Sequence, residues 1–254
     1  MQFRDAGYGY DVFGFSPKWL DVTSKVMKPV YEHYFRVKSY GFENVPMEGP
    51  AILAGNHSGT IPIDGMMLSL DVLFKSDFKR NPRATIDYFV AGLPFVGTLF
   101  SRVGAIIGSR GNFRYCLEQG DLIVVFPEGE PGVSKPFSKR YQLQKWRVGH
   151  VEFAIRYRSP VVPVAIIGAE EQMPLMGRIP IKLFGSPHIP VPASPFPLPV
   201  RYHIHYGEPI HLQKEYEPSD ANDPAILREA SERVKVEVEK LVARGLEMRE
   251  GVFV

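Results

Sequence analysis

The sequence has a single cysteine, no long apolar run and little net charge, and each of these shortages excludes a class of protein. Cys116 is the only cysteine in 254 residues, so no disulfide can form within the chain, which fits a reducing compartment. No segment approaches the ~18 consecutive apolar residues of a membrane-spanning helix. The N-terminal stretch MQFRDAGYGYDVFGFSPK lacks the apolar region of a signal peptide. A formal net charge of +2 is too small to indicate nucleic-acid binding.

The remaining composition is that of a folded α/β protein. Hydrophobic residues make up 44% and charged residues 23% of the chain, values that are ordinary for globular domains. Between Ser16 and Arg36 the apolar residues recur at helical spacing, and Pro29 is expected to kink this helix. We therefore expect an N-terminal amphipathic helical region over residues 1–38 and one α/β domain over residues 39–254.

Apolar runs alternate with helical patterns through the rest of the chain. The expected strands are Pro50–Asn56, Leu122–Phe126, Val161–Gly168 and, as an edge strand, Arg201–Gly207. The expected helices are Asp64–Phe74, one that ends at Gly120, Lys145–Arg158 and Ala225–Arg244. This alternation predicts an α/β fold with a mostly parallel or mixed central sheet, helices on both faces, and the amphipathic helix in front of it.

Two chemically versatile side chains directly follow two of these strands. His57 stands after the AILAG strand, and Glu128 stands after the LIVVF strand. Ligands of open α/β sheets bind outside the carboxyl ends of the strands, so parallel neighbours would place both residues in one crevice. A histidine can accept a proton near neutral pH, and a carboxylate on its other ring nitrogen fixes its tautomer. Asp64 is the nearest candidate for that carboxylate.

Four short motifs follow one another in a fixed order between Tyr40 and Gly168. They are Asn56-His57 with Asp64, GAIIGSR at 104–110, FPEG at 126–129 and VVPVAIIG at 161–168. In this order they resemble the blocks of the glycerolipid acyltransferases, typified by the lysophosphatidate and glycerol-3-phosphate acyltransferases. His-x4-Asp alone would be a weak signal, but four ordered blocks are specific.

The sequence departs from the family pattern at two places. The spacing is His-x6-Asp, which resembles the longer loop of the diacylglycerol-acyltransferase-like subset. After FPEG the chain continues with Glu130-Pro131-Gly132, where many members that recognise a phosphate have Thr-Arg-Ser. Either another cation replaces that arginine or the acceptor carries no phosphate there; the candidate cations are Arg110, Lys135 and Arg140.

The resemblance implies transfer of a fatty acyl group from an acyl thioester to a hydroxyl of a lysophospholipid or related glycerolipid. His57 is then the general base, Asp64 orients it, and Glu128 with Gly129 positions the acceptor. Acyl-CoA or acyl carrier protein is the co-substrate, and no further cofactor is implied. Two alternatives stay open: an acyl thioester hydrolase, although the chain lacks the Gly-x-Ser-x-Gly of serine esterases, and a non-catalytic lipid-binding relative.

The other histidines do not indicate a metal site, because His203, His205 and His211 lack suitable spacing with carboxylates or the thiol.

Two stretches of the chain contain no acidic residue. Residues 131–151 contain five cations, and residues 172–207 contain eight prolines. Together with the lysines of the first helix, these stretches favour a protein peripheral to the cytoplasmic face of a membrane, bound to its surface, to the thioester donor or to both. Packing against the sheet or a solvated helix face explains them equally well. The oligomeric state is open.

Overall fold

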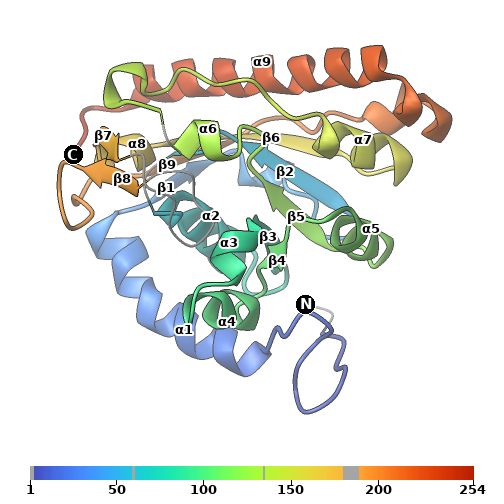
Figure 1. The fold of residues 1–254 in the computed structure, drawn as a ribbon, viewed down its shortest axis with the longest axis horizontal. Helices are drawn as coiled ribbons and strands as arrows, with labels where there is room; N and C mark the ends of the chain where they lie inside the picture. The colour runs from blue at the N-terminus through green and yellow to red at the C-terminus, as the bar shows by residue number, and fades with distance from the viewer. Residues whose placement is uncertain (1–2, 59–60, 134, 180–188) are drawn as a thin grey trace.

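A seven-stranded sheet forms the centre of the molecule, in a computed structural model that describes residues 3–58, 61–133, 135–179 and 189–254. Its strand order is β1-β9-β6-β2-β5-β3-β4. All neighbouring pairs are parallel except β6 with β9. The expected fold, a mostly parallel or mixed α/β sheet with helices on both faces, is confirmed (Figure 1).

The three central strands are apolar because both of their faces are covered. β2 (Ala51–Gly55), β5 (Leu122–Val125) and β6 (Val161–Ile167) are buried along their whole length. Such strands lack the alternation of a half-exposed strand and consist mostly of Val, Ile, Leu and Ala. The register pairs Ala54 of β2 with Val125 of β5, so the chain leaves both strands at the same level of the sheet.

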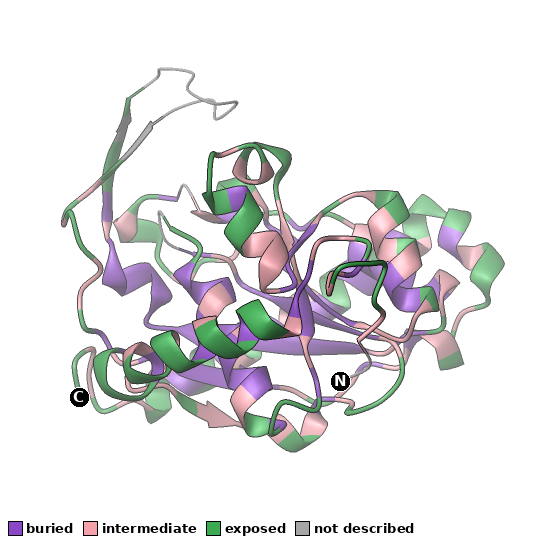
Figure 2. Cartoon of the chain, turned by 90° about the horizontal axis from the view of Figure 1, so that it is seen from below, coloured by how far each residue is buried: buried purple, intermediate pink, exposed green. Residues whose placement is uncertain are grey.

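Helices cover the two faces with two separate apolar cores. On one face, α5 (Arg110–Glu118), α7 (Gly149–Arg156) and α9 (Pro224–Met248) pack on the sheet. On the other, α2 (Ile63–Lys75) and η1 (Val30–Tyr34) enclose the second core. Figure 2 shows this layering, with the strands buried in the middle and the exposed surface on the outer sides of the helices.

The rest of the described chain forms further strands and helices. The remaining strands are β1 (Lys38–Tyr40), β3 (Pro82–Ile86), β4 (Ile106–Ile107), β9 (His203–Tyr206) and a separate hairpin of β7 (Leu175–Ile179) and β8 (Ile189–Pro192). The remaining α-helices are α1 (Pro17–Pro29), α3 (Tyr88–Ala91), α4 (Val96–Arg102), α6 (Glu130–Val133) and α8 (Ala169–Gln172). The single-turn helices are η2 (Phe42–Asn44), η3 (Phe137–Lys139), η4 (Leu212–Lys214) and η5 (Pro218–Asn222).

Three elements can be compared with the form that the sequence predicts for them. The expected edge strand is β9, but it lies inside the sheet between β6 and β1, which is the true edge. The helix expected from Lys145 begins only at Gly149, because residues 145–148 run back along the FPEG turn, where the Arg147 N–H donates to the Pro127 carbonyl at 3.0 Å. The kink expected at Pro29 is present as a change from α-helix to the wider π-helix η1.

Candidate active site

His57 and Glu128 lie together at the carboxyl edge of the sheet because β2 and β5 are parallel neighbours. Between the strand and His57, Asn56 fixes the end of β2 to β6: its side-chain amide donates to the Ile166 carbonyl at 3.0 Å and accepts from the Ile166 N–H at 2.8 Å. Asn56 is fully buried. Asn56 therefore fixes the end of β2, and this fixes the backbone position of His57, the next residue.

The imidazole of His57 contacts the carboxylate of Asp64 in spite of the longer loop. His57 Nδ1 lies 2.7 Å from Asp64 Oδ2. Asp64 stands in the first turn of α2 and is completely buried, and it also accepts from the backbone N–H groups of Ser58 at 2.8 Å and Gly65 at 2.7 Å. Because a carboxylate only accepts hydrogen bonds, this arrangement keeps the proton on Nδ1 and leaves Nε2 with a free lone pair.

Phe126, the first residue after β5, covers one face of the imidazole. The ring of Phe126 stacks on the ring of His57 with centroids 4.4 Å apart. A Cβ at Gly65 would lie 3.2 Å from the same phenyl ring, so α2 approaches this stack closely. The side chain of His57 is 16% exposed. Nε2 has no hydrogen-bond partner within the described part of the chain, so this nitrogen is open to an incoming hydroxyl.

Glu128 supports the histidine from beneath. Its side chain is 1% exposed, and it accepts from the His57 N–H at 3.1 Å and from the Gln144 N–H at 2.7 Å. Gly132 closes over it: a Cβ there would lie 2.8 Å from the Glu128 Cβ and 3.2 Å from the His57 Cβ. The structure thus places Glu128 in contact with the histidine backbone, inside the protein.

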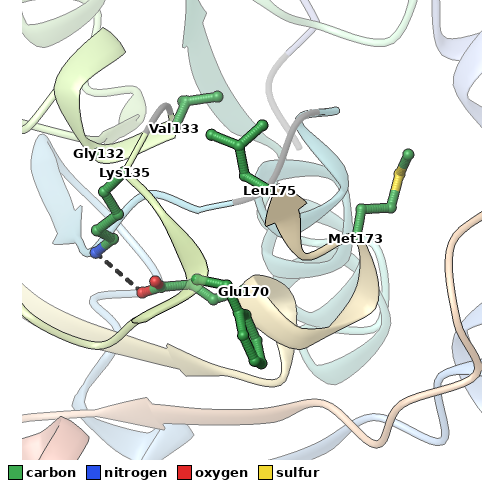
Figure 3. A pocket seen from close by; sticks show the side chains of 7 residues that line it. Gly132, Val133, Lys135, Glu170, Met173 and Leu175 are labelled. Carbon is green, nitrogen blue, oxygen red and sulfur yellow. Dashed lines mark ion pairs between the residues drawn. The ribbon is translucent and has the colours of Figure 1, made fainter. Parts of the chain in front are cut away.

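Lys135 belongs to the same buried group. Its ammonium lies 3.0 Å from Glu170 and 3.8 Å from Glu128, and the side chain is 4% exposed. Figure 3 shows the Lys135–Glu170 ion pair with the apolar side chains of Val133, Met173 and Leu175 nearby, around a cavity of about 10 Å³. Burial raises the pKa of Glu170 to about 7, although Lys135 acts in the opposite direction. Lys135, expected from the sequence as a substrate-binding cation, therefore pairs with two buried carboxylates of the protein.

The two expected arginines lie in different places. Arg110 is the first residue of α5, which follows β4, and β4 lies three strands away from β2 in the sheet. Its guanidinium donates to both oxygens of Glu152 at 2.8 and 2.5 Å. Those hydrogen bonds raise the pKa of Arg110 and lower the pKa of Glu152. Arg140 is exposed, 3.8 Å from Glu171 and packed over the ring of Phe137. Neither arginine contacts His57.

Comparisons with known proteins show the family of the chain. The family model described as Acyltransferase matches residues 36–167, which is more than half of the chain. An uncharacterized protein of Mycobacterium tuberculosis is 34% identical over 261 residues, covering 97% of this chain and 72% of that protein. The chain belongs to the acyltransferase family.

Two further proteins that are similar to this acyltransferase act on lipids according to their descriptions. A Bos taurus protein described as a DGAT1/2-independent enzyme synthesizing storage lipids is 26% identical over 208 residues, or 80% of this chain and 58% of that protein. The crystal structure of the 1-acyl-sn-glycerophosphate acyltransferase PlsC from Thermotoga maritima has a TM-score of 0.56 at 19% identity, covering 91% of this chain and 81% of that one. The latter likeness shows a shared fold. The resemblance to glycerolipid acyltransferases is confirmed.

The guanidinium of Arg147 packs against the FPEG turn of the acyltransferase. Gly129 has φ +60°, which side chains rarely adopt, and a Cβ there would lie 3.2 Å from this guanidinium, which would have to move slightly. Arg147 is exposed and forms no ion pair with any residue that the structure describes. The absence of acids from 131–151 pointed to this stretch, but the sequence could not show which of its cations returns to the turn.

Other features of the acyltransferase lie away from His57. A cleft of about 650 Å³ opens at the opposite edge of the sheet, lined among others by Gly49, Arg80 and Leu122. Over the described ranges there is no group of three or more metal-binding side chains. Nor does any described helix have the length and apolar character needed to cross a bilayer.

Proposed function

We propose that this acyltransferase moves a fatty acyl group from an acyl thioester to a hydroxyl of a lysophospholipid or related glycerolipid, with His57 as the general base. The observation that carries the proposal is the 2.7 Å contact of His57 Nδ1 with the buried carboxylate of Asp64, which leaves Nε2 free at the carboxyl edge of the sheet. A base oriented in this way is the arrangement that hydroxyl activation requires.

The proposed reaction is a direct transfer. Nε2 takes the proton of the acceptor hydroxyl while the hydroxyl oxygen attacks the thioester carbonyl, and Asp64 stabilises the imidazolium that forms. The tetrahedral intermediate then expels the thiolate, which receives the proton from Nε2. The products are an ester and a free thiol. General-base assistance of this kind contributes ~10²–10⁴-fold, or about 3–5 kcal/mol of barrier.

Glu128 and Lys135 act in this proposal by positioning. Glu128 accepts from the His57 N–H and from the Gln144 N–H, so it connects the histidine loop to the segment after FPEG. Lys135 lies between Glu128 and Glu170 and offsets part of their negative charge. Because Glu128 and Lys135 are buried, they are better placed to support the catalytic loop than to contact a lipid head group.

Exposed cations beside the FPEG turn supply the proposed contact with anionic parts of the substrates. Arg147 packs on Gly129, and Lys139, Arg140 and Lys145 are exposed in the same segment. Guanidinium and ammonium groups bind phosphates by charge-assisted hydrogen bonds. We assign to this segment the phosphate of the acceptor, or the phosphates of the donor when it is CoA or acyl carrier protein.

The outer face of α1 suits contact with a membrane surface. Trp19, Val22 and Val26 are exposed there at 47%, 49% and 62%. Lys18 and Lys25 are exposed on the same helix. An amphipathic helix with lysine beside tryptophan and aliphatic side chains binds the interface of anionic bilayers. A peripheral position would give the active site access to lipid acceptors.

The test is the release of free thiol from acyl-CoA or acyl carrier protein with and without lysophospholipid or diacylglycerol acceptors, with the lipid products identified by mass spectrometry. The proposal predicts thiol release that depends on an acceptor, in equal amount with acylated lipid. Release without an acceptor would identify a hydrolase. A protein that binds the lipids but releases no thiol from any donor would be a non-catalytic relative.

A further inference from the structure

The hairpin of α3 and α4 carries large apolar side chains that the protein does not cover. The exposed fractions are 66% for Tyr88, 38% for Phe89, 91% for Phe95, 40% for Val96 and 43% for Leu99. No charged residue lies between Asp87 and Arg102. Single exposed apolar residues are ordinary, but five within twelve positions indicate a surface with a partner.

Phe95 is the most exposed of these side chains and has an unusual backbone. It stands between the two helices with φ +63° and ψ −41°, in a γ-turn that the Val96 N–H closes by donating to the Pro94 carbonyl at 2.7 Å, a rare and strained conformation. Its ring forms no aromatic contact within the described structure. The fold therefore gains nothing from an aromatic residue at this position, which indicates that the ring acts on something outside the protein.

The hairpin starts at the edge of the sheet that carries the active site and ends beside the start of α1. It follows β3, which is the neighbour of β5 in the sheet, so it starts at the edge where His57 and Glu128 lie. At its other end the Arg102 carbonyl accepts from the Ser16 N–H at 3.1 Å, directly before α1. Figure 1 shows α4 beside the start of α1, with α9 on the far side of the molecule.

We infer that the α3–α4 hairpin inserts into the interfacial layer of a phospholipid bilayer, with Phe95 as its tip. This inference rests on the proposed function, since that function requires lipid acceptors that reside in a bilayer. The uncharged hairpin matches the acyl region, and the exposed lysines of α1 match anionic head groups beside it. Insertion at this point brings the edge that carries His57 to the lipid surface.

The test compares wild-type protein with Phe95→Asn and Met248→Asn. Phe95 is 91% exposed, so the first variant loses almost no packing within the protein and should fold as the wild type does, as thermal melting will show. Met248 is 45% exposed at the end of α9, away from the hairpin. Each protein is sedimented with phosphatidylcholine/phosphatidylglycerol vesicles, and transfer is measured with acceptor presented in vesicles and dispersed in detergent micelles.

The inference predicts that Phe95→Asn weakens vesicle binding about tenfold or more and lowers transfer to vesicle lipids, while transfer in micelles is unchanged. Met248→Asn should match the wild type in all assays. Equal binding by Phe95→Asn and wild type would overturn the inference. A wild-type protein that does not bind vesicles would also overturn it. So would a wild-type dimer that Phe95→Asn dissociates, because the hairpin would then be a dimer interface. In each case transfer in micelles persists, whereas failure of the proposed function abolishes transfer in every format.

Discussion

At the scale of single residues, the site depends on one buried carboxylate that serves three donors. Asp64 accepts from the imidazole of His57 and from the N–H groups of Ser58 and Gly65. These contacts explain how a loop two residues longer than the family pattern still delivers the aspartate: the first turn of α2 fixes the carboxylate, and the loop only has to span the distance. The catalytic roles of His57 and Asp64 stay predictions.

Replacing Asp64 with asparagine should lower kcat by ~10²–10⁴-fold while the protein stays folded. The amide can donate to Nδ1 of His57, which moves the imidazole proton to Nε2 and removes the lone pair that accepts the hydroxyl proton. Steady-state kinetics with a saturating acceptor will measure the effect, and circular dichroism will monitor the fold. A kcat near that of the wild type would contradict the role of Asp64.

Replacing Glu128 with glutamine should destabilise the protein by about 1–3 kcal/mol, because its two oxygens accept from the His57 and Gln144 N–H groups and the amide NH2 of glutamine cannot accept one of these buried hydrogen bonds. Glu118→Gln is the matched control. Its carboxylate is half exposed and 3.8 Å from Arg114 on the surface of α5, a type of pair that contributes about 0–1 kcal/mol. Urea unfolding will measure both variants, and equal losses would show that Glu128 is not an internal support.

The sequence placed the central site residues well because they directly follow apolar strands. It could not show that Lys135 is buried between Glu128 and Glu170. Those carboxylates come from segments after two different strands, and only the strand order brings them together. Arg147 was hidden for the same reason: its contact with Gly129 depends on a return of the chain that no local pattern encodes.

At the scale of elements, the position of α9 over the sheet depends on a glycine in the helix. A Cβ at Gly245 would lie 2.2 Å from the Ile167 Cδ1 of β6 and 2.8 Å from the His205 Nε2 of β9. The helix can approach this closely only without a side chain at that position. The second half of α9 and the two strands beneath it are therefore packed as one unit.

We expect Gly245→Ala to destabilise the protein by about 1–3 kcal/mol, since α9 or β9 must move to make room. Gly149→Ala is the same substitution at the start of α7, where no heavy atom lies within 4 Å of the added Cβ. There alanine should be neutral or stabilise by up to about 1 kcal/mol. The free energies of unfolding will decide, and a neutral Gly245→Ala would refute the packing argument.

The strands with a continuous apolar run were predicted correctly, whereas β3 was missed and β9 was expected at the edge of the sheet. β3 begins with a proline and contains Arg83, whose buried guanidinium pairs with Asp11 at 2.6 Å, so its sequence does not resemble a strand. β9 alternates like an edge strand, yet His203 and His205 are buried beneath α9 and next to Tyr40. Tertiary contacts, which the local pattern does not contain, decide both cases.

At the scale of the whole molecule, buried histidines should make the fold sensitive to acid. Burial lowers the pKa of both His150 and His205 from 6.5 to about 4. Between these values the unfolded chain binds protons that the folded chain does not, so the free energy of unfolding falls as the pH falls. Glu170 acts oppositely: its raised pKa makes its contribution fall as the pH rises from about 4.5 to about 7. Burial shifts the pKa of Asp71 upward, as it does for Glu170, and the pKa of His203 downward, as it does for the other two histidines. The three histidines together outweigh the two carboxyl groups.

Urea unfolding at neutral pH and near pH 5 should therefore show lower stability at the acidic value. His205→Gln removes one of the titrating groups, so its loss of stability between the two conditions should be smaller than that of the wild type. An unchanged difference in the variant would show that His205 does not contribute to the acid sensitivity.

The most direct test of the proposed chemistry is kcat for acceptor-dependent thiol release by His57→Ala and His33→Ala. His33 is exposed on η1, so its loss should leave kcat at the wild-type value. His57→Ala should lower kcat by ~10²–10⁴-fold with unchanged folding, because Nε2 accepts the hydroxyl proton. Equal and near-normal kcat in both variants would contradict the assignment of His57 as the base.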